Sequence, residues 1–374
     1  MGRKYSLDLI RILATCMVII VHTKDIFFNR NLVLRTWSVF RVLGTYGVPL
    51  FVLLTGYLML HKDFEEKEYL NKFVKHNILP LLISFEFWNI AWFVLNHIPV
   101  LSTYQKDIPT QIDQVIKSCL FIGNTNDAMW YLHMILGLYL GMPIVSLAIK
   151  RLKGTSYAQI LFVLLVLCGT IVPSLGMLIK TYKIVFPIFP VLNLNIFAVT
   201  VWGNSVWMLY LLAGYLVRQG SFRRISSAKL FMMGVLVPAI LSYRFELYCI
   251  RHHLPSLVSY DFILIVLTSI STFELFTRLD GRYVVSSFLQ SIIGFVSKYS
   301  FSVYMLHLFV CAVLYKAILK IGGWSLPIGY GLPKVVHIFT YGAFVISVFL
   351  LSEVIAYIFG KIPCVKKWLF MVKD

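Results

Sequence analysis

The chain has 374 residues, of which 59% are hydrophobic and only 13% are charged, and its mean hydropathy is +0.82. A soluble domain has about 45–50% apolar and about 25% charged residues, so this composition excludes a soluble protein and indicates an integral membrane protein. The formal net charge is +18, but the basic residues lie mostly in short segments between apolar runs. The positive-inside rule explains this distribution, and we expect no nucleic-acid partner.

Long apolar runs, rather than short alternating strands, predict an all-α polytopic membrane protein with one domain over residues 1–374. The ten predicted transmembrane helices lie near 7–28, 45–61, 76–97, 129–149, 157–179, 202–218, 229–248, 259–277, 299–320 and 335–360. An even number places both termini on one side of the membrane. The loops on that side carry more Lys and Arg, so we predict that both termini are cytoplasmic.

The first predicted helix is unusual because its apolar sequence contains Asp8, Arg11 and His22. Arg11 and His22 are eleven residues apart, so they share one helix face about 16 Å apart along the axis. Asp8 lies one turn before Arg11 and can pair with it. Ionisable groups in a membrane are costly unless they are paired or face a polar cavity, so this stripe is a candidate site. The alternative is that Arg11 reaches the inner surface and His22 is interfacial.

Two segments, 62–75 and 182–201, are not predicted as plain spans. Residues 62–75 are charged, with apolar residues at helical spacing, and we expect them to lie along the inner membrane surface. Residues 182–201 contain two prolines and two asparagines. This segment is an outer loop, a re-entrant piece or an additional span.

Other polar residues have two readings each. Glu86 and Glu353 are intramembrane acids that either line a cavity or form structural pairs. For Glu353 we favour a structural pair, because it is near a span end. His307 is either a site residue or a hydrogen-bonded packing histidine. Trp130 fits an aromatic belt or a sugar platform. The charged stretch 244–253 is predicted to be a solvated outer loop.

The six cysteines show no pairing or metal-ligand spacing. Most lie in apolar runs, so we expect them to be reduced packing residues. The two adjacent histidines at 252 and 253 would point in different directions on a regular element. We therefore predict no metal site.

Several stretches together resemble the acyltransferase 3 family of membrane proteins, whose bacterial members O-acetylate cell-surface glycans. The family's pattern of arginine, ten residues and histidine falls on Arg11 and His22, and Asp8 stands at the matching acidic position. The segments VPLFVLLTGYLML (48–60) and MWYLHMILGLYLGMPIV (129–145) resemble two further family segments.

The later part of the chain extends the resemblance. The segment KYSFSVYMLHLFV (298–310) is similar to a family segment and places Ser300, Tyr304 and His307 at its polar positions, and LLAGYLV (211–217) is similar to another. The matches occur in the expected order over most of the chain. Together they are specific for the family, although not for one member of it.

The chain departs from the family pattern at two places. Many members carry an Arg-x-x-Arg pair after the second span that is thought to help hold the acyl donor, and the nearest pair here is Lys72 and Lys75. Lysine keeps the charge but lacks the planar fork of arginine. Members often have a histidine just before Leu-Trp, whereas here Met129 precedes Trp130 and His133 follows it.

The resemblance implies an O-acyltransferase in the cytoplasmic membrane of a bacterium. It would move an acyl group, usually acetyl, from cytoplasmic acetyl-CoA or another acyl-CoA to a hydroxyl of a cell-surface or lipid-linked glycan. The implied catalytic residues are His22, as general base or transient acyl carrier, and Arg11 with Asp8, which position the acyl donor. Lys72 and Lys75 would bind that donor. The candidates for supporting the site or binding the acceptor are Glu86, Trp130, His133, Ser300, Tyr304 and His307.

Two other classes of function share many of these features. A transporter or flippase of a glycan or lipid-linked sugar would also have many spans, a polar cavity and buried charges. It would be expected to show matched broken helices in two halves, and the sequence shows none. A catalytically inactive assembly partner would need neither His22 nor an acyl donor.

Overall fold

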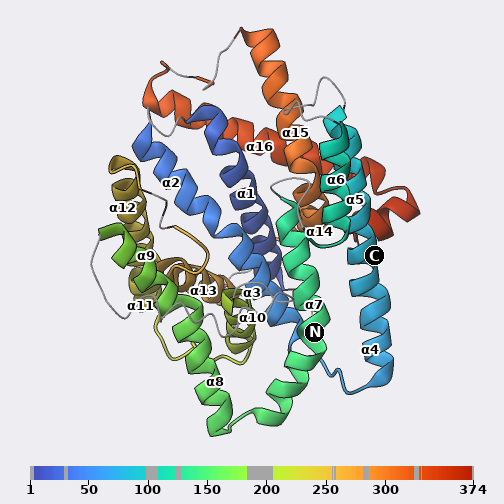
Figure 1. The fold of residues 1–374 in the computed structure, drawn as a ribbon, viewed down its shortest axis with the longest axis vertical. Coiled ribbons are helices and arrows are strands. Elements are labelled where there is room, and N and C mark those ends of the chain that lie inside the picture. Colours follow the sequence, from blue (N-terminus) through green and yellow to red (C-terminus); the bar gives the residue numbers. More distant parts are fainter. Residues whose placement is uncertain are drawn as a thin grey trace.

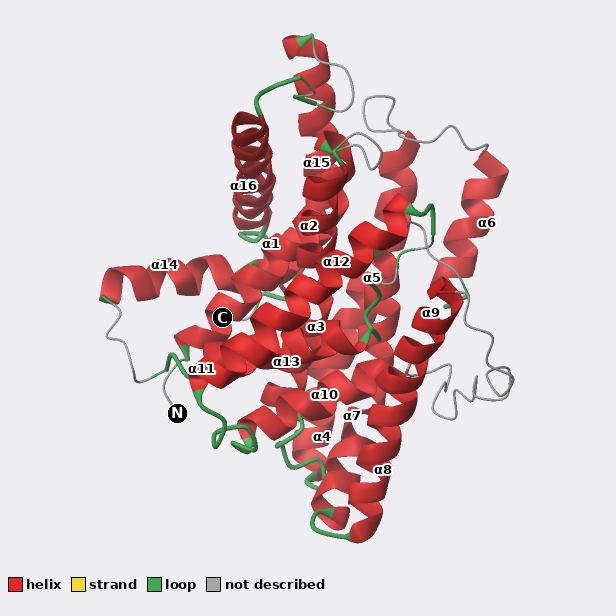
Figure 2. Ribbon diagram, turned by 90° about the vertical axis from the view of Figure 1, so that its left-hand side faces the viewer, coloured by secondary structure: helices red, strands yellow, loops and turns green. Residues whose placement is uncertain are grey.

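The computed structural model describes residues 4–28, 33–97, 108–122, 128–182, 205–254, 256, 258–280, 286–323, 328–329 and 331–372. Over these ranges the chain is mostly helical and has no strand (Figures 1 and 2). The predicted all-α class is therefore confirmed. The six cysteines all lie in these ranges and are free thiols; Cys249 and Cys311 are buried, whereas Cys364 is exposed.

The helices follow one another in chain order. They are α1 (Tyr5–Phe27), α2 (Leu34–Thr45), α3 (Gly47–Met59), α4 (Lys67–Phe73), α5 (Leu79–His97), α6 (Ile108–Cys119), α7 (Met129–Leu152), α8 (Ser156–Val166), α9 (Val172–Tyr182), α10 (Ser205–Arg218), α11 (Ser227–Lys229), α12 (Val237–Arg251), α13 (Ile263–Thr277), α14 (Ser287–Lys298), α15 (Ser300–Gly322) and α16 (Lys334–Phe359), with π-helical turns at Val74–Ile78, Leu167–Ile171, Leu230–Leu236 and Val365–Leu369.

Eight helical runs in the described ranges are long and apolar enough to cross a membrane. The shorter apolar helices Val206–Arg218 and Ile263–Thr277 lie where the other two spans are predicted. The second run differs from the prediction because it starts at Leu34, so α2 is a helix where a loop was expected. Beyond Tyr182, the segment 182–201 lies outside the described residues.

From Lys67 the stretch 62–75 continues into α5 as one helical run, and its place along the inner membrane surface stays a prediction. One further expectation was wrong. The charged stretch 244–253 is not a solvated loop, because most of it is the end of α12. Glu246 is fully buried there and accepts a hydrogen bond from Ser256 Oγ at 2.6 Å. The charge of Glu246 favoured a solvent-exposed position. In the structure, Ser256 from the loop after α12 supplies a hydrogen bond to this buried side chain.

Proline explains three of the four π-helical turns. The turns end at Ile78, Ile171 and Leu236, and in each case proline follows two residues later. Proline has no N–H and its ring clashes with a carbonyl one turn earlier. The preceding turn widens and keeps the run continuous, so these breakers bend long helices without ending them.

Glycine allows neighbouring helices to approach closely at three positions. A Cβ on Gly56 of α3 would lie 1.9 Å from Leu211 O, and a Cβ on Gly214 of α10 would lie 2.0 Å from Leu53 O. The two glycines therefore make reciprocal backbone contacts between α3 and α10. Gly44 packs against Val21 of α1 in the same way.

Helix α14 runs across the direction of α15 and α16 (Figure 2). The apolar residues Phe288, Ile292 and Phe295 on it are exposed and recur at helical spacing, which is typical of a helix at the membrane interface. The helix ends beside α1, where Ser297 is buried.

The C-terminal segment also reaches the interior. Ser84 Oγ and Trp88 Nε1 of α5 donate to the carbonyl of Leu369 at 2.9 and 3.4 Å, and Phe370 is buried. This segment thereby brings Met371 to the wall of the larger cavity.

Candidate active site

The acidic and basic residues at the N-terminal end of α1 form a pair, as the sequence predicted. Arg11 Nη1 donates to Asp8 Oδ1 at 2.8 Å. Ser297 Oγ of α14 donates to the same oxygen at 2.6 Å, and Arg11 Nη1 lies 3.4 Å from Ser297 Oγ. The Asp8 side chain is only 3% exposed. Asp8 and Ser297 therefore hold the guanidinium in one position.

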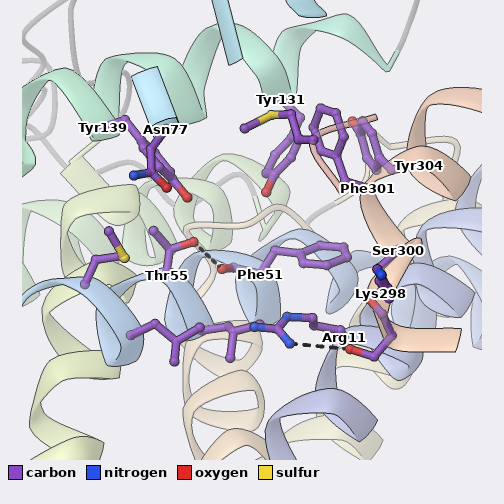
Figure 3. A pocket seen from close by; sticks show the side chains of 15 residues that line it. Arg11, Phe51, Thr55, Asn77, Tyr131, Tyr139, Lys298, Ser300, Phe301 and Tyr304 are labelled. Carbon is purple, nitrogen blue, oxygen red and sulfur yellow. Dashed lines mark hydrogen bonds between the residues drawn. The ribbon is translucent and has the colours of Figure 1, made fainter. Parts of the chain in front are cut away.

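Arg11 lies in the wall of a cavity of about 500 Å³, which we call the Arg11 cavity. Figure 3 shows Arg11 on one side, with Tyr131 and Tyr139 across from it. The other lining residues come from α3, α14, α15, the turn before α5 and the C-terminal segment: Phe51, Leu54, Thr55, Leu58, Met59, Asn77, Ser297, Lys298, Ser300, Phe301, Tyr304 and Met371. The volume is in the range of small-molecule sites, and the wall is apolar with a few polar groups.

His22 lies in the wall of a second cavity of about 340 Å³, which we call the His22 cavity. The residues that line it come from α1, α2, α3, α7, α15 and the loop before α13: Val18, Val21, His22, Lys24, Asp25, Arg41, Gly44, Val48, Trp130, Tyr260 and Tyr304. The predicted stripe on α1 therefore faces two cavities, with its cation in one and its histidine in the other.

Tyr304 lines both cavities. Its hydroxyl donates to the carbonyl of Ala128 at 2.7 Å, and its ring centroid is 5.0 Å from that of Tyr131. The side chain is only 4% exposed, so it is fixed from both ends. Tyr304 is therefore the group that the Arg11 cavity and the His22 cavity share.

His307 is fully buried beside His22. The ring centroids of the two histidines are 5.3 Å apart. His307 Nδ1 lies 2.6 Å from the carbonyl of Tyr304. A carbonyl can only accept, so Nδ1 carries the proton and Nε2 is left with its lone pair. This Nε2 has no hydrogen-bond partner among the described residues.

Aromatic residues form one wall of the His22 cavity. The ring of Trp130 lies 5.4 Å from that of Tyr260, and Trp207 packs behind both, at 5.7 and 5.0 Å. The Tyr260 phenol can donate or accept a hydrogen bond at this wall. Trp130 therefore lines a cavity, and its role as a sugar platform stays a prediction.

Sequence reasoning missed four polar or aromatic residues of this cavity: Lys24, Asp25, Arg41 and Tyr260. Lys24 and Asp25 form an ion pair at 2.8 Å, and Trp37 Nε1 donates to Asp25 at 2.6 Å. Arg41 was treated as a loop residue, but α2 carries it onto the cavity wall. Its helical spacing from Gly44 and Tyr46 could have indicated this position. The predicted spans did not include α2, because they were assigned from long apolar runs.

Several predicted residues lie away from both cavities. Lys72 and Lys75 are exposed, although they precede Asn77 of the Arg11 cavity on the same helical run. His133 Nε2 lies 3.2 Å from the carbonyl of Ser118, and its ring packs against Phe85.

Glu86 is half-buried and lines neither cavity. Ser300 lines the Arg11 cavity while its hydroxyl donates to Ser297 O at 2.9 Å. Among the residues that the structure describes, no group of three or more His, Cys, Asp or Glu side chains is placed to hold a metal ion.

Comparison with known proteins gives one match. A family model for the acyltransferase domain called acyltransferase 3 matches residues 4–360. No curated protein and no solved structure matches the chain. The family match covers nearly the whole chain, including both cavities except for Met371. The chain therefore belongs to the acyltransferase 3 family and is a membrane acyltransferase.

Proposed function

We propose that the protein transfers an acyl group, usually acetyl, from acyl-CoA to a hydroxyl of a cell-surface or lipid-linked glycan. The observation that carries the proposal is the pair of cavities that share Tyr304. A transfer between two substrates needs two binding spaces that meet at the reacting atoms. Both termini and the Arg11 cavity would face the cytoplasm of a bacterium, and the His22 cavity would open toward the outer face of its cytoplasmic membrane.

The Arg11 cavity suits the thioester end of the acyl donor. Its wall is largely apolar, with the fixed guanidinium of Arg11 and the exposed Lys298 beside it. A guanidinium can fork onto a phosphate or polarise a carbonyl oxygen. Lys72 and Lys75 would bind the donor phosphates from outside the cavity, as point charges.

His22 suits proton transfer because it lies in the other cavity with the acceptor. As a general base, it would take the proton of the acceptor hydroxyl while that oxygen bonds to the thioester carbonyl carbon. The carbon–sulfur bond then breaks and coenzyme A leaves as the thiolate, which takes up the proton. As an acyl carrier, a His22 ring nitrogen would first bond to the carbonyl carbon and then pass the acyl group to the acceptor oxygen.

The test uses a bacterium that makes the full chain, with mass spectrometry of its surface glycans. We expect His22→Gln to lower acetylation by a factor of about 10²–10⁴, the usual contribution of a general base. The matched control is His252→Gln, which changes an exposed histidine at the end of α12. Wild-type acetylation by a membrane-inserted His22→Gln protein would overturn the proposal and favour an assembly partner.

A second measurement addresses the acyl donor. Coenzyme A should raise the unfolding temperature of the purified protein, and Arg11→Lys should weaken this protection while the exposed-site control Arg244→Lys keeps it. Isotope-labelled acetyl that stays on His22 before acceptor is added would identify the carrier route. Family membership favours the enzyme over a transporter, and a complete lack of protection by coenzyme A would contradict the proposed donor.

A further inference from the structure

Arg41 has no role in the transfer described above. It is half-buried on α2 and lines the His22 cavity. Within the described ranges its guanidinium makes no ion pair and no hydrogen bond. A cation in a partly buried cavity costs free energy unless an opposite charge compensates it, so Arg41 indicates that something anionic enters this cavity.

The other charges near the cavity are already compensated. Lys24 is bound by Asp25 Oδ2 at 2.8 Å and by the carbonyl of Val21 at 2.9 Å. Asp25 also accepts from Trp37. Glu246, on α12, is held by Ser256 and is not part of the cavity wall. Arg41 is therefore the cation of the described wall that remains available to a ligand.

The rest of the wall points to a sugar. Trp130 and Tyr260 provide aromatic faces that can stack against the apolar face of a pyranose ring, and His22 is in the same cavity. A ring on this platform, with one hydroxyl at His22, would have room for a substituent at Arg41. Guanidinium recognises carboxylate and phosphate by two parallel hydrogen bonds.

We propose that the acyl acceptor carries an anionic group, which Arg41 binds while a hydroxyl of the same molecule meets His22. The group is the carboxylate of an acidic sugar or a phosphate attached to the sugar. This inference rests on the proposed function, because it takes the His22 cavity to be the acceptor site. A neutral glycan would leave the Arg41 charge uncompensated in the bound state.

Binding of small matched probes to the full-length protein in nanodiscs tests the inference without any transfer. The probes are methyl glucoside, which is neutral, methyl glucuronide, which carries a carboxylate, and glucose 1-phosphate. We expect at least one charged probe to bind about tenfold more tightly than methyl glucoside, the effect of a charge-assisted hydrogen-bond pair. The better of the two charged probes identifies the source of the charge.

Two variants and a control assign the preference to Arg41. Arg41→Gln should abolish the advantage of the charged probe, and Arg41→Lys should retain part of it because the charge stays but the fork is lost. Arg35→Gln is the matched control, because Arg35 lies on the same helix, is exposed and does not line the cavity. The preference in the wild-type protein should weaken at high salt.

Each outcome is decisive for the inference. The inference is overturned if neutral and charged probes bind equally, or if neither charged probe binds at its highest soluble concentration. It is also overturned if a folded Arg41→Gln protein keeps the preference unchanged. The proposed function is judged separately, by acetylation of surface glycans. A charge preference without any acetyl transfer would support the anion site and contradict the proposed transfer. Acetyl transfer without a charge preference would support the proposed transfer and contradict the anion site.

Discussion

His307 places a lone pair next to the proposed base. Its Nδ1–H is used by the carbonyl of Tyr304 at 2.6 Å, which leaves Nε2 buried and without a hydrogen-bond partner in the described ranges. A buried acceptor of this kind costs stability unless it has a function or meets a partner during the reaction. The His22 ring, at 5.3 Å between centroids, is the nearby group that gains a proton in the proposed transfer.

We therefore expect His307→Asn to lower the acetylation rate about tenfold, within the range for a group that assists proton transfer. The asparagine amide can still donate to Tyr304 O, but it has no lone pair in the place of Nε2. The measurement is kcat and KM in nanodiscs. A positioning role lowers kcat and leaves the KM for acyl-CoA unchanged.

The control for His307 is a variant that loses both nitrogens. His307→Leu should lower kcat at least as much as His307→Asn and also lower the unfolding temperature, because the Tyr304 carbonyl loses the hydrogen bond from the side chain of residue 307. A His307→Asn enzyme with wild-type kcat would show that the histidine only packs between helices.

At the scale of elements, α14 connects an exposed apolar helix face to the Arg11 cavity. Its exposed apolar face includes Phe288 and Ile292, while its last turn carries Ser297, which donates to Asp8 at 2.6 Å. A serine–carboxylate hydrogen bond of this kind contributes about 1.5–3 kcal/mol. The orientation of Arg11 therefore depends on a helix far along the chain.

Ser297→Ala should weaken coenzyme A binding about tenfold, because Asp8 then holds Arg11 less firmly. Ser291→Ala is the matched control, since Ser291 is an exposed residue of the same helix and its hydroxyl donates to Ser287 O within that helix. Titration calorimetry with both variants measures the difference. Equal affinities would mean that Arg11 needs no support from α14.

The contact of α3 with α10 depends on glycine. A methyl group on Gly56 would lie 1.9 Å from Leu211 O, so Gly56→Ala must push the two helices apart. We expect a loss of about 3 kcal/mol, the upper end for overpacked sites, seen as a lower unfolding temperature in detergent. Gly342→Ala on α16 is the control, because its added methyl would have no described neighbour within 4 Å apart from the adjoining residues and nearby backbone of α16 itself. If both variants unfold at the same temperature, the close approach of α3 and α10 at Gly56 does not contribute to stability.

At the scale of the whole molecule, apolar runs predicted most of the helices, because a membrane span must be long and apolar. They missed α2, whose sequence from Leu34 to Thr45 includes Arg35 and Arg41. The two arginines lower the mean hydropathy of α2, and hydropathy cannot distinguish an arginine that faces a cavity from one in a loop. The structure shows that Arg41 lines the His22 cavity.

For the site, only contacts between residues of the same helix could be predicted from the sequence. The Asp8–Arg11 pair follows from helical spacing and was confirmed at 2.8 Å. Ser297 and Met371 could not be assigned to the Arg11 cavity in this way, because each reaches it through packing between distant segments. Sequence gave Tyr304 a candidate role, but its position between the two cavities depends on the placement of α15 against α7.

In the proposed transfer, that position would make Tyr304 a barrier between water in the acceptor cavity and the thioester in the donor cavity. Tyr304→Ala should join the Arg11 and His22 cavities and admit water to the thioester. We expect hydrolysis of acetyl-CoA without any acceptor to rise about tenfold or more, and glycan acetylation to fall. Release of free coenzyme A thiol by the purified protein measures the first, and glycan mass spectrometry measures the second.

Tyr304→Phe separates the ring from the hydroxyl. It loses the hydrogen bond to Ala128 O at 2.7 Å, which costs about 1 kcal/mol of stability, but it keeps the aromatic ring that closes the passage. Hydrolysis by Tyr304→Phe should therefore stay low while that of Tyr304→Ala rises. If the two variants hydrolyse acetyl-CoA equally, the ring of Tyr304 does not separate the two cavities, and another group must keep water from the acyl donor.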